Sequence, residues 1–441
     1  MKKVGLKSLG CKLNQSDTEI IANILSDNNY KIVPFDSLAD IYIINTCTVT
    51  KEGDVSSRRA VNQAIKKNSN ALIFVAGCYA ETNPDDFKIN GKRIINIGHK
   101  NKFNILRYLE LPAHYKQDHR WTDVNIKNSF FTTRAFIKIQ DGCNFNCSYC
   151  KARIARWKSE SKPVDNIIKE INNLVSLGTK EVVLCGMNIG LYNHNNINLP
   201  QLLEIILDKS TISRVRLSSI DICDVTSDLI KIVKNNERIC KHLHLPLQSA
   251  SNKILKLMKR RYTIEKYNEV LQNIFANIKD VGIGADVMVG FPSETDYDWN
   301  KTLQFIEKNN FAYLHIFSYS DRAETDSYKL NDKVPKKLIK LRSKITRDFT
   351  KKIIEQYKKG FINREATILI ENRHNNEKVS GLTSNYLRVY INPHHPDSHV
   401  ATPDKILNTL QKVRIISYEY DKLWGIIPRH SDLQMAQNSA G

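Results

Sequence analysis

Six of the nine cysteines fall into two sets of three whose positions suit metal binding. The first set, Cys143, Cys147 and Cys150, has the spacing Cys-x3-Cys-x2-Cys on one short segment. Three thiolates on one loop supply three of the four ligands of a 4Fe–4S cluster and leave one iron open. A zinc site is the alternative, but a closed zinc site needs four ligands, and no fourth thiol or imidazole lies close in sequence.

The second set, Cys11, Cys47 and Cys78, is dispersed along the first part of the chain. Each of these cysteines directly follows a short apolar run that predicts a strand; the runs are residues 4–9, 41–44 and 72–76. In an open parallel sheet, ligands bind outside the carboxyl ends of the strands, so we expect the three thiols to converge at one crevice. There they could hold a second cluster. The alternative for each one is an ordinary buried cysteine.

The remaining cysteines, Cys185, Cys223 and Cys240, have no ligand-like partners, so we expect them to be small buried side chains. The longest apolar stretch, near residues 71–78, is much shorter than the about 20 residues that a membrane span needs. The N-terminal residues lack the apolar core of a signal peptide. We therefore expect a cytoplasmic protein without membrane contact, in which structural disulfides do not form.

The chain is strongly basic, with 66 Lys and Arg against 46 Asp and Glu and a net charge of +20. Such a balance favours a polyanionic partner, usually nucleic acid. Part of the lysine content can instead follow overall composition, because the chain is also rich in Asn and Ile. Residues 332–359 concentrate the charge, with eleven Lys or Arg against three Asp or Glu. A solvated helix face is the alternative explanation there.

The elements that position the second thiol set lie in residues 1–110, which alternate strand and helix patterns. This order predicts a doubly wound parallel sheet. We expect its first helix over residues 17–28, because Ser16 and Glu19 stand at capping-box spacing. A polar stretch without periodicity, residues 111–130, is interpreted as a linker.

The first thiol set belongs to residues 131–360, where six strand and helix patterns alternate. The predicted strands are residues 135–140, 181–185, 215–219, 242–247, 285–289 and 313–319. A closed parallel barrel needs eight such units, so we expect an open (β/α)6 barrel. The thiols directly follow its first strand, at the end of the barrel where active sites form.

The C-terminal part changes character. A long amphipathic helix is predicted over residues 336–359, with Leu338, Leu341, Ile345, Phe349 and Ile353 as its buried stripe. Residues 361–430 contain short alternating runs, which predict a small antiparallel β-barrel. Residues 431–441 are polar, and we expect a disordered tail.

The cysteine spacing of the first set, with Tyr149 before its last cysteine, resembles the radical S-adenosylmethionine (SAM) superfamily. Further segments resemble the methylthiotransferase family within it; they are residues 8–19 (SLGCKLNQSDTE), 45–50 (NTCTVT), 76–80 (AGCYA), 244–249 (HLPLQS), 258–263 (MKRRYT) and 284–292 (GADVMVGFP). The likeness implies three domains, the last a TRAM domain that binds RNA. It also implies two 4Fe–4S clusters and SAM, used once to methylate a sulfur and once to generate a radical.

The subfamilies differ in substrate, and the segment around Cys11 is similar to those that act on threonylcarbamoyladenosine at position 37 of tRNA, next to the anticodon. The resemblance leaves two other substrates open, isopentenyladenosine in tRNA and an aspartate of a ribosomal protein. The non-enzyme alternative is an iron–sulfur protein without catalytic activity, which only binds RNA or carries electrons. The implied partners are the anticodon stem-loop of tRNA and an external one-electron donor such as flavodoxin or ferredoxin, and we expect a monomer.

Candidate SAM-binding residues follow from the same resemblance and from strand ends. Gly186 follows the second barrel strand, where the superfamily's backbone contacts the SAM amino group. Ser219, Gln248 and Asp286 end later strands and are expected at the same mouth, with a purely structural role as the alternative. Arg156 is a further candidate, because it matches the family pattern within a segment that otherwise departs from it.

Two departures concern positions where the family has glycine. Trp157 follows Arg156 where the family has Gly, and Ala323-Glu324 replaces a Pro-Gly pair after Arg322. Loss of glycine removes positions where the backbone can approach a ligand closely. All six cysteines of the two sets are kept, which favours retained cluster chemistry.

Overall fold

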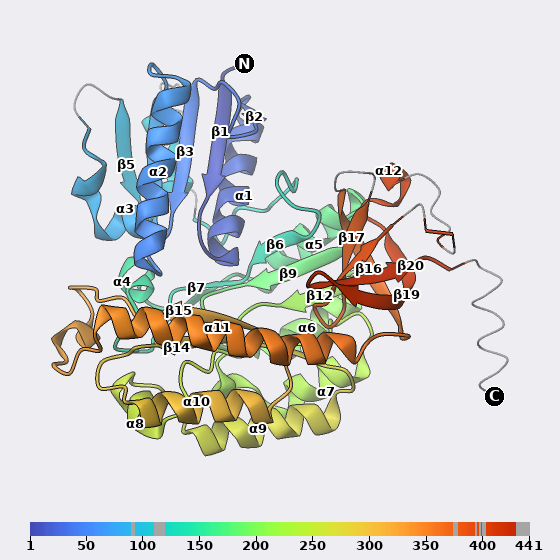
Figure 1. Cartoon of the computed structure of the whole chain (residues 1–441). Coiled ribbons are helices and arrows are strands. Elements are labelled where there is room, and N and C mark those ends of the chain that lie inside the picture. Colours follow the sequence, from blue (N-terminus) through green and yellow to red (C-terminus); the bar gives the residue numbers. More distant parts are fainter. Residues whose placement is uncertain are drawn as a thin grey trace.

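The structure is a computed structural model that describes residues 1–89, 93–109, 120–373, 378–392, 395–396, 398 and 403–428. It comprises, in chain order, a parallel five-stranded sheet, an open β/α barrel and a small closed β-barrel (Figure 1). The predicted α/β fold class is confirmed. The predicted linker at residues 111–130 lies partly outside the described residues, and the predicted disordered tail at residues 431–441 lies wholly outside them. Within the described part, no helix is both long enough and apolar enough to cross a membrane.

The N-terminal sheet has the strand order β2-β1-β3-β4-β5, and its neighbouring strands are parallel. Its elements are β1 (Lys3–Ser8), α1 (Lys12–Asp27), β2 (Lys31–Val33), β3 (Ile41–Thr46), α2 (Lys51–Lys67), β4 (Leu72–Gly77), α3 (Cys78–Thr82) and β5 (Ile94–Gly98). Helix α1 packs Ile20 and Ile24 on one face of the sheet, and α2 packs Val61 and Ala64 on the other. Because both faces are covered, β3 is buried at every position, as in a doubly wound sheet.

Helix α1 begins at Lys12, with Cys11 extended before it, and not at residue 17. The predicted capping box is therefore wrong, because Ser16 and Glu19 lie inside the helix. Both side chains bind the following domain instead. The Ser16 hydroxyl donates to the carbonyl of Phe136 (3.0 Å), and the Glu19 carboxylate accepts from the backbone N–H of Phe130 (2.9 Å). The local pattern could not reveal this use, since the partners lie more than a hundred residues away.

The six predicted barrel strands are all present. They are β6 (Ala135–Lys138), β9 (Glu181–Cys185), β12 (Arg214–Leu217), β13 (His242–His244), β14 (Gly282–Val289) and β15 (Phe311–Ser318). They form two parallel three-stranded sheets, which isolated bridges join between β12 and the segment of β13. Among the described residues β6 does not pair with β15, so the barrel is open as predicted. Helix α1 lies against β6 and β9 (Figure 1).

Helices and short hairpins surround these strands. The helices are α4 (Ala152–Arg156), α5 (Val164–Ser176), α6 (Leu199–Lys209), α7 (Ser227–Asn235), α8 (Asn252–Leu257), α9 (Ile264–Asn277) and α10 (Asp296–Lys308), and the short strands are β7 (Gln140–Asp141), β8 (Glu160–Ser161), β10 (Asn193–His194) and β11 (Ile197–Asn198). Strong N-caps begin several helices; Thr295 and Asp298, for example, form a reciprocal capping box at α10.

Helix α11 (Lys336–Lys359) has the predicted bounds but not the predicted buried stripe. Leu341 and Ile345 are 54% and 40% exposed. The buried face lies one residue further along, which turns the helix by about 100°. Its residues are Ile339, Arg342, Ser343, Thr346, Thr350 and Tyr357. The packing there is polar, because Arg342 pairs with Glu294 (3.0 Å), and hydrophobic periodicity alone could not find such a face.

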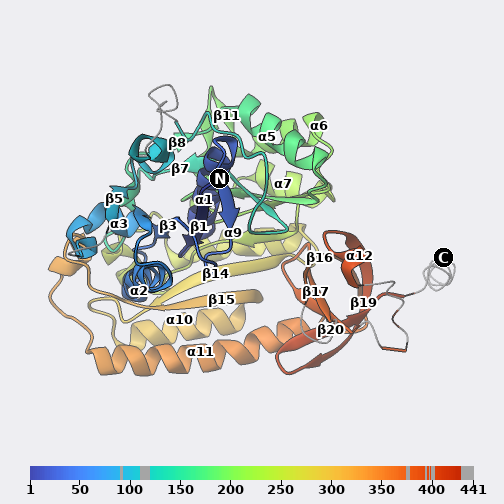
Figure 2. The same cartoon turned by 90° about the horizontal axis from the view of Figure 1, so that it is seen from above.

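The C-terminal unit is a closed barrel with the strand order β16-β17-β18-β20-β19. Its elements are β16 (Glu365–Arg373), β17 (Val379–Thr383), β18 (Arg388–Ile391), α12 (Pro403–Ile406), β19 (Leu410–Glu419) and β20 (Lys422–Ile426). The predicted small barrel is confirmed, but it is not wholly antiparallel, because β18 and β20 pair in parallel. Figure 2 shows it at the end of α11, beside β14 and β15.

Two buried arginines join this small barrel to the β/α barrel. Arg216 pairs with Glu181 (2.7 Å) and donates to the carbonyls of Ser384 (2.8 Å) and Thr383 (2.9 Å), which lie in the turn after β17. Arg214 donates to the carbonyl of Leu382 (3.0 Å). The turn between β17 and β18 is thus held at the amino ends of the barrel strands.

We predict that Arg216→Leu lowers the midpoint of thermal unfolding strongly. The substitution leaves the buried Glu181 carboxylate without its closest cation, and breaking a buried pair costs about 3–5 kcal/mol. Arg364→Leu is the matched control, because Arg364 pairs with Asp280 (2.9 Å) while both side chains are about half exposed. In this control the free energy of unfolding should fall by no more than about 1 kcal/mol. Equal shifts for the two variants would contradict the assigned role of Arg216.

Candidate active site

The second thiol set converges at the carboxyl edge of the N-terminal sheet. Cys47 directly follows β3, and Cys78 directly follows β4. Cys11 directly precedes α1, which begins at the same edge. Gly10 has a φ of +85°, and a Cβ there would lie 2.3 Å from the Cys47 sulfur, so only glycine lets the Cys11 loop come so close. Burial, with smaller contributions from Cys11 and Cys78, raises the pKa of Cys47 to about 12.

The first thiol set lies on the loop between β7 and α4. The backbone N–H of Cys150 donates to the carbonyl of Cys147 (3.1 Å), and that of Cys143 donates to the carbonyl of Trp157 (2.9 Å). These bonds fold the loop back on itself. Burial, with smaller contributions from Cys147 and Cys143, raises the pKa of Cys150 to about 11. The three cysteines therefore lie on one short folded loop.

Each thiol set has an arginine that donates to one of its sulfurs. Arg156 Nε lies 3.2 Å from Cys78 Sγ, and Arg260 Nη1 lies 3.4 Å from Cys147 Sγ. A guanidinium beside a thiol favours the thiolate, which is the form that binds metal. Three thiols, one fixed cation and no fourth protein thiol in either set fit a 4Fe–4S cluster with one open iron better than a closed zinc site.

Arg156 is the centre of a buried ionic network between the two domains. Its guanidinium pairs with Asp17 of α1 (2.8 Å) and Asp141 of β7 (2.9 Å). Lys138 bridges the same two carboxylates, and Lys102 pairs with Asp17 (2.5 Å). Burial by itself would raise the pKa of Asp141, but Arg156 and Lys138 hold it well below its usual range.

The network carries three cations against two carboxylates, which leaves one excess positive charge beside Cys78. His99 adds none, because burial lowers its pKa to about 3 and the ring stays neutral. An excess positive charge in a buried site stabilises thiolates. The network therefore joins the domains and places positive charge beside the second thiol set.

Three of the predicted SAM-binding residues lie together inside the barrel. The Ser219 hydroxyl and the Asp286 carboxylate are linked through His244, at 2.7 and 3.2 Å. The backbone N–H of Gln248 donates to the carbonyl of Asp286 (2.8 Å). Asp286 also contacts His315 (3.1 Å). His244, Asp286 and His315 offer ligand atoms within 4.8 Å of one another, but hydrogen bonds among these side chains already account for that closeness.

The other two predicted residues do not bond to this group. Gly186 follows β9, and a Cβ there would lie 2.6 Å from Gln140 Oε1, so this position requires a residue without a side chain. Arg156 contacts Cys78 of the second thiol set and is not in the group around Asp286. Cys185 and Cys240 are buried as expected, whereas Cys223 is exposed, because it lies in the short turn Ile222–Asp224 after β12.

Sequence reasoning missed several residues of the site. Arg260 and His244 stood in the motifs that carry the resemblance but received no role. Lys138 interrupts an apolar strand, and that interruption was the available signal for a buried charge. Lys102 and His99 had no local signal, because their partners come from α1 and β7.

Both departures from the family pattern are accommodated locally. Trp157 has a φ of +52°, the conformation that glycine adopts easily, and Lys100 lies 3.9 Å above its ring. Glu324 pairs with Lys151 (2.9 Å), the residue after Cys150, and Lys151 also donates to Asn83 (2.7 Å). The charge at position 324 is thus neutralised by the thiol loop itself.

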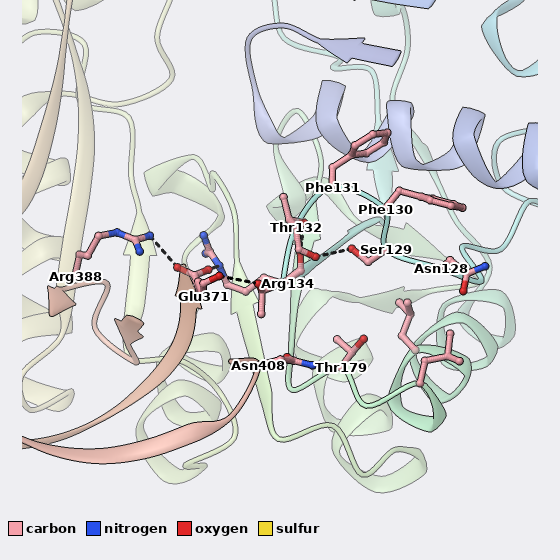
Figure 3. A pocket seen from close by; sticks show the side chains of 13 residues that line it. Asn128, Ser129, Phe130, Phe131, Thr132, Arg134, Thr179, Glu371, Arg388 and Asn408 are labelled. Atoms are coloured by element: carbon pink, nitrogen blue, oxygen red, sulfur yellow. Dashed lines mark hydrogen bonds and ion pairs between the residues drawn. The ribbon is translucent and has the colours of Figure 1, made fainter. Parts of the chain in front are cut away.

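A surface cleft of about 790 Å³ is separate from both thiol sets (Figure 3). It lies between residues 128–134, α5 and the small barrel, and the Glu371 carboxylate at its base binds Arg134 and Arg388. The cleft contains none of the cysteines. The ion pairs of Glu371 with Arg134 and Arg388 make this cleft a joint between domains.

Comparisons with known proteins agree with this site. Residues 137–306 match the radical SAM superfamily, and residues 3–96 match the uncharacterized protein family UPF0004. The chain is 36% identical to the threonylcarbamoyladenosine tRNA methylthiotransferase MtaB of Aquifex aeolicus, over 88% of this chain and 96% of the relative. It is 32% identical to the tRNA-2-methylthio-N(6)-dimethylallyladenosine synthase of Thermodesulfovibrio yellowstonii, over 87% and 91%.

The methyltransferase TsrM of Kitasatospora setae, a radical SAM enzyme, superposes with a TM-score of 0.53 at 11% identity, over 72% of this chain and 73% of the other. That likeness concerns the fold alone. With a fold and thiol loop of the radical SAM class and full-length relatives above 30% identity, the chain belongs to the methylthiotransferase family of radical SAM enzymes. Membership of this class implies SAM and a 4Fe–4S cluster as cofactors.

We predict that Asp17→Asn loosens the contact between the first two domains. It leaves three buried cations with one carboxylate, at a cost of about 3–5 kcal/mol. Hydrogen exchange of α1 and β6 should accelerate, and the midpoint of thermal unfolding should fall. Asp27→Asn, in the last turn of the same helix, is the control, because Asp27 pairs with Lys127 at an exposed site. Unchanged exchange in the Asp17 variant would show that the network does not hold the domains.

Proposed function

We propose that this enzyme converts threonylcarbamoyladenosine at position 37 of tRNA, next to the anticodon, into its 2-methylthio derivative. The observation that carries the proposal is the presence of two three-thiol sites, one in each of two domains that a shared ionic network joins. Relatives named for this reaction match nearly the whole chain, and the segment around Cys11 is of the same subfamily type.

We further propose that the two thiol sets hold two 4Fe–4S clusters. Cys143, Cys147 and Cys150 would hold the one at which SAM binds, and Cys11, Cys47 and Cys78 the auxiliary one. When bound, the clusters and SAM supply a radical that activates the C–H bond and a methylated sulfur for insertion.

The chain's own residues position these groups. Arg156 and Arg260 each place a positive charge beside one sulfur of a thiol set. Gly186, Ser219, Gln248 and Asp286 are proposed to line the SAM site. Hydrogen bonds to His244 orient the side chains of Ser219 and Asp286, and a backbone bond to Asp286 positions Gln248. The barrel mouth is covered by the N-terminal domain, which would keep water away from the reacting centre.

The proposed tRNA contact uses the small barrel and α11. On the barrel's outer surface Tyr390 and Trp424 have ring centroids 5.7 Å apart, with Lys378 and Lys422 within 5.1 Å of the rings. Aromatic rings with nearby cations can stack bases and attract phosphates. The basic residues of α11 add charge toward the anticodon stem-loop, although Arg342 is used internally.

Three further expectations complete the proposal. The radical chemistry needs one electron from outside, and a flavodoxin or ferredoxin would supply it. We propose a monomer, since each thiol set is complete within one chain. A cytoplasmic location follows from the proposed tRNA substrate.

Deleting the gene should remove one methylthio nucleoside from bulk tRNA. We expect mass spectrometry of digested tRNA to show loss of 2-methylthio-threonylcarbamoyladenosine and accumulation of its unmodified precursor. Loss of the 2-methylthio derivative of isopentenyladenosine instead would show that this enzyme acts on isopentenyladenosine. A mass change in a ribosomal protein, with all tRNA nucleosides unchanged, would refute the tRNA proposal. Complementation with a Cys143→Ala variant should fail to restore the nucleoside.

Anaerobic reconstitution should load about eight irons per chain, as two 4Fe–4S clusters require. The triple variant Cys11→Ala/Cys47→Ala/Cys78→Ala should hold about four irons. The matched control replaces Cys185, Cys223 and Cys240 with alanine and should keep about eight. An iron content of about four in the unmodified protein, unaffected by the first triple variant, would disprove the auxiliary cluster.

A further inference from the structure

Lys12 directs a positive charge into the barrel beside the second thiol set. It is the first residue of α1 and follows Cys11, so its Cα lies about 3.8 Å from that of a proposed cluster ligand. Its Nζ lies 5.0 Å from the ring centre of Tyr386, which belongs to the small barrel. Lys12 therefore stands where all three domains meet, within reach of a substrate that reacts at the auxiliary cluster.

The ammonium of Lys12 lacks a carboxylate partner among the described residues. By contrast, two neighbouring cations have carboxylate partners. Arg216 pairs with Glu181 (2.7 Å), and Arg134 pairs with Glu371. Lys12 is also only partly exposed. A half-buried cation without an anion is costly, so such a residue is expected to meet an anion supplied by a ligand.

Tyr386 supplies a second polar group at the same place. It occupies the turn between β17 and β18 with a φ of +72°, an unfavourable conformation for an aromatic residue that the surrounding contacts maintain. Its ring packs against Tyr313 (5.0 Å) and His242 (4.4 Å) on the inner surface of the barrel. Although burial alone would raise the pKa of Tyr386, Lys12, Arg134 and Arg216 lower it, which shows a positive environment.

An aromatic path leads from this point to the predicted SAM-binding group. Tyr313 lies 5.1 Å from His315, and His315 contacts Asp286. His315 is more than half exposed and comes from β15, the strand at the open side of the barrel. A nucleoside that enters by this side would meet aromatic rings along its base and Lys12 at the end nearest the small barrel.

We propose that Lys12, assisted by the Tyr386 hydroxyl, is the specificity-determining residue that binds the free carboxylate of the threonylcarbamoyl group. This inference rests on the proposed function. The threonine of that group is attached through its amino nitrogen, so its carboxylate stays charged. An isopentenyl group carries no charge, and its binding would leave the half-buried ammonium of Lys12 without an anion. The lysine thus selects for the anionic substrate and against the apolar one.

The test compares an anticodon stem-loop RNA carrying threonylcarbamoyladenosine with the same RNA carrying its methyl ester, which lacks the charge. For the reconstituted unmodified enzyme we expect kcat/KM and equilibrium binding to favour the acid by about 10- to 100-fold, as a charge-assisted hydrogen bond gives. Lys12→Gln should reduce this ratio to about one, and Lys12→Arg should keep a preference for the acid. The ratio is independent of how much enzyme is active.

Lys31→Gln is the matched control, because it removes the same charge from an exposed position of the same domain and should leave the ratio unchanged. If the unmodified enzyme modifies neither RNA but modifies an isopentenyladenosine stem-loop, the proposed function itself is wrong. If it modifies the acid and Lys12→Gln still prefers the acid over the ester, the assignment of Lys12 alone is overturned. Equilibrium binding by fluorescence anisotropy gives a readout that does not depend on turnover.

Discussion

The structure depends above all on the burial of Arg156 between two domains. Its guanidinium is 4% exposed and contacts a carboxylate from each domain, together with a thiol of the second set. A buried cation must be paired, and its partners are supplied by α1 and β7. The two domains therefore cannot separate without leaving charges buried and unpaired. The same interaction fixes the position of the second thiol set relative to the first.

The two thiol sets are assembled in different ways, although each consists of three cysteines with an arginine beside one sulfur. The loop of Cys143, Cys147 and Cys150 is local, and backbone hydrogen bonds fold it. The other set comes from three strand ends, and a glycine at position 10 permits the close approach of Cys47. In both cases an arginine lies beside a sulfur. The joint of Arg216 with the turn after β17 then closes the far end of the barrel, so the proposed substrate site is enclosed by all three units.

Much of this arrangement was predictable, because it depends on the periodicity of apolar residues and on the spacing of the cysteines. The six barrel strands, the parallel N-terminal sheet and the small closed barrel all follow from patterns of apolar residues. The convergence of Cys11, Cys47 and Cys78 follows from a general property of parallel sheets. Predictions failed where polar contacts replaced apolar packing. Helix α11 buries Arg342 and Thr346 instead of Leu341 and Ile345, and Ser16 contacts Phe136 instead of capping a helix.

The sequence by itself determined the fold class and the two groups of cysteines, because strand order and the positions of the cysteines can be read along the chain. The tertiary structure alone decided which charges are buried and which partner each one has. Arg156 was expected at SAM and lies at Cys78; Lys12 was part of a motif and proves to face Tyr386. Electrostatic partners lie far apart in sequence, and whether a cation is paired depends on the dielectric surroundings and geometry that only the folded chain creates.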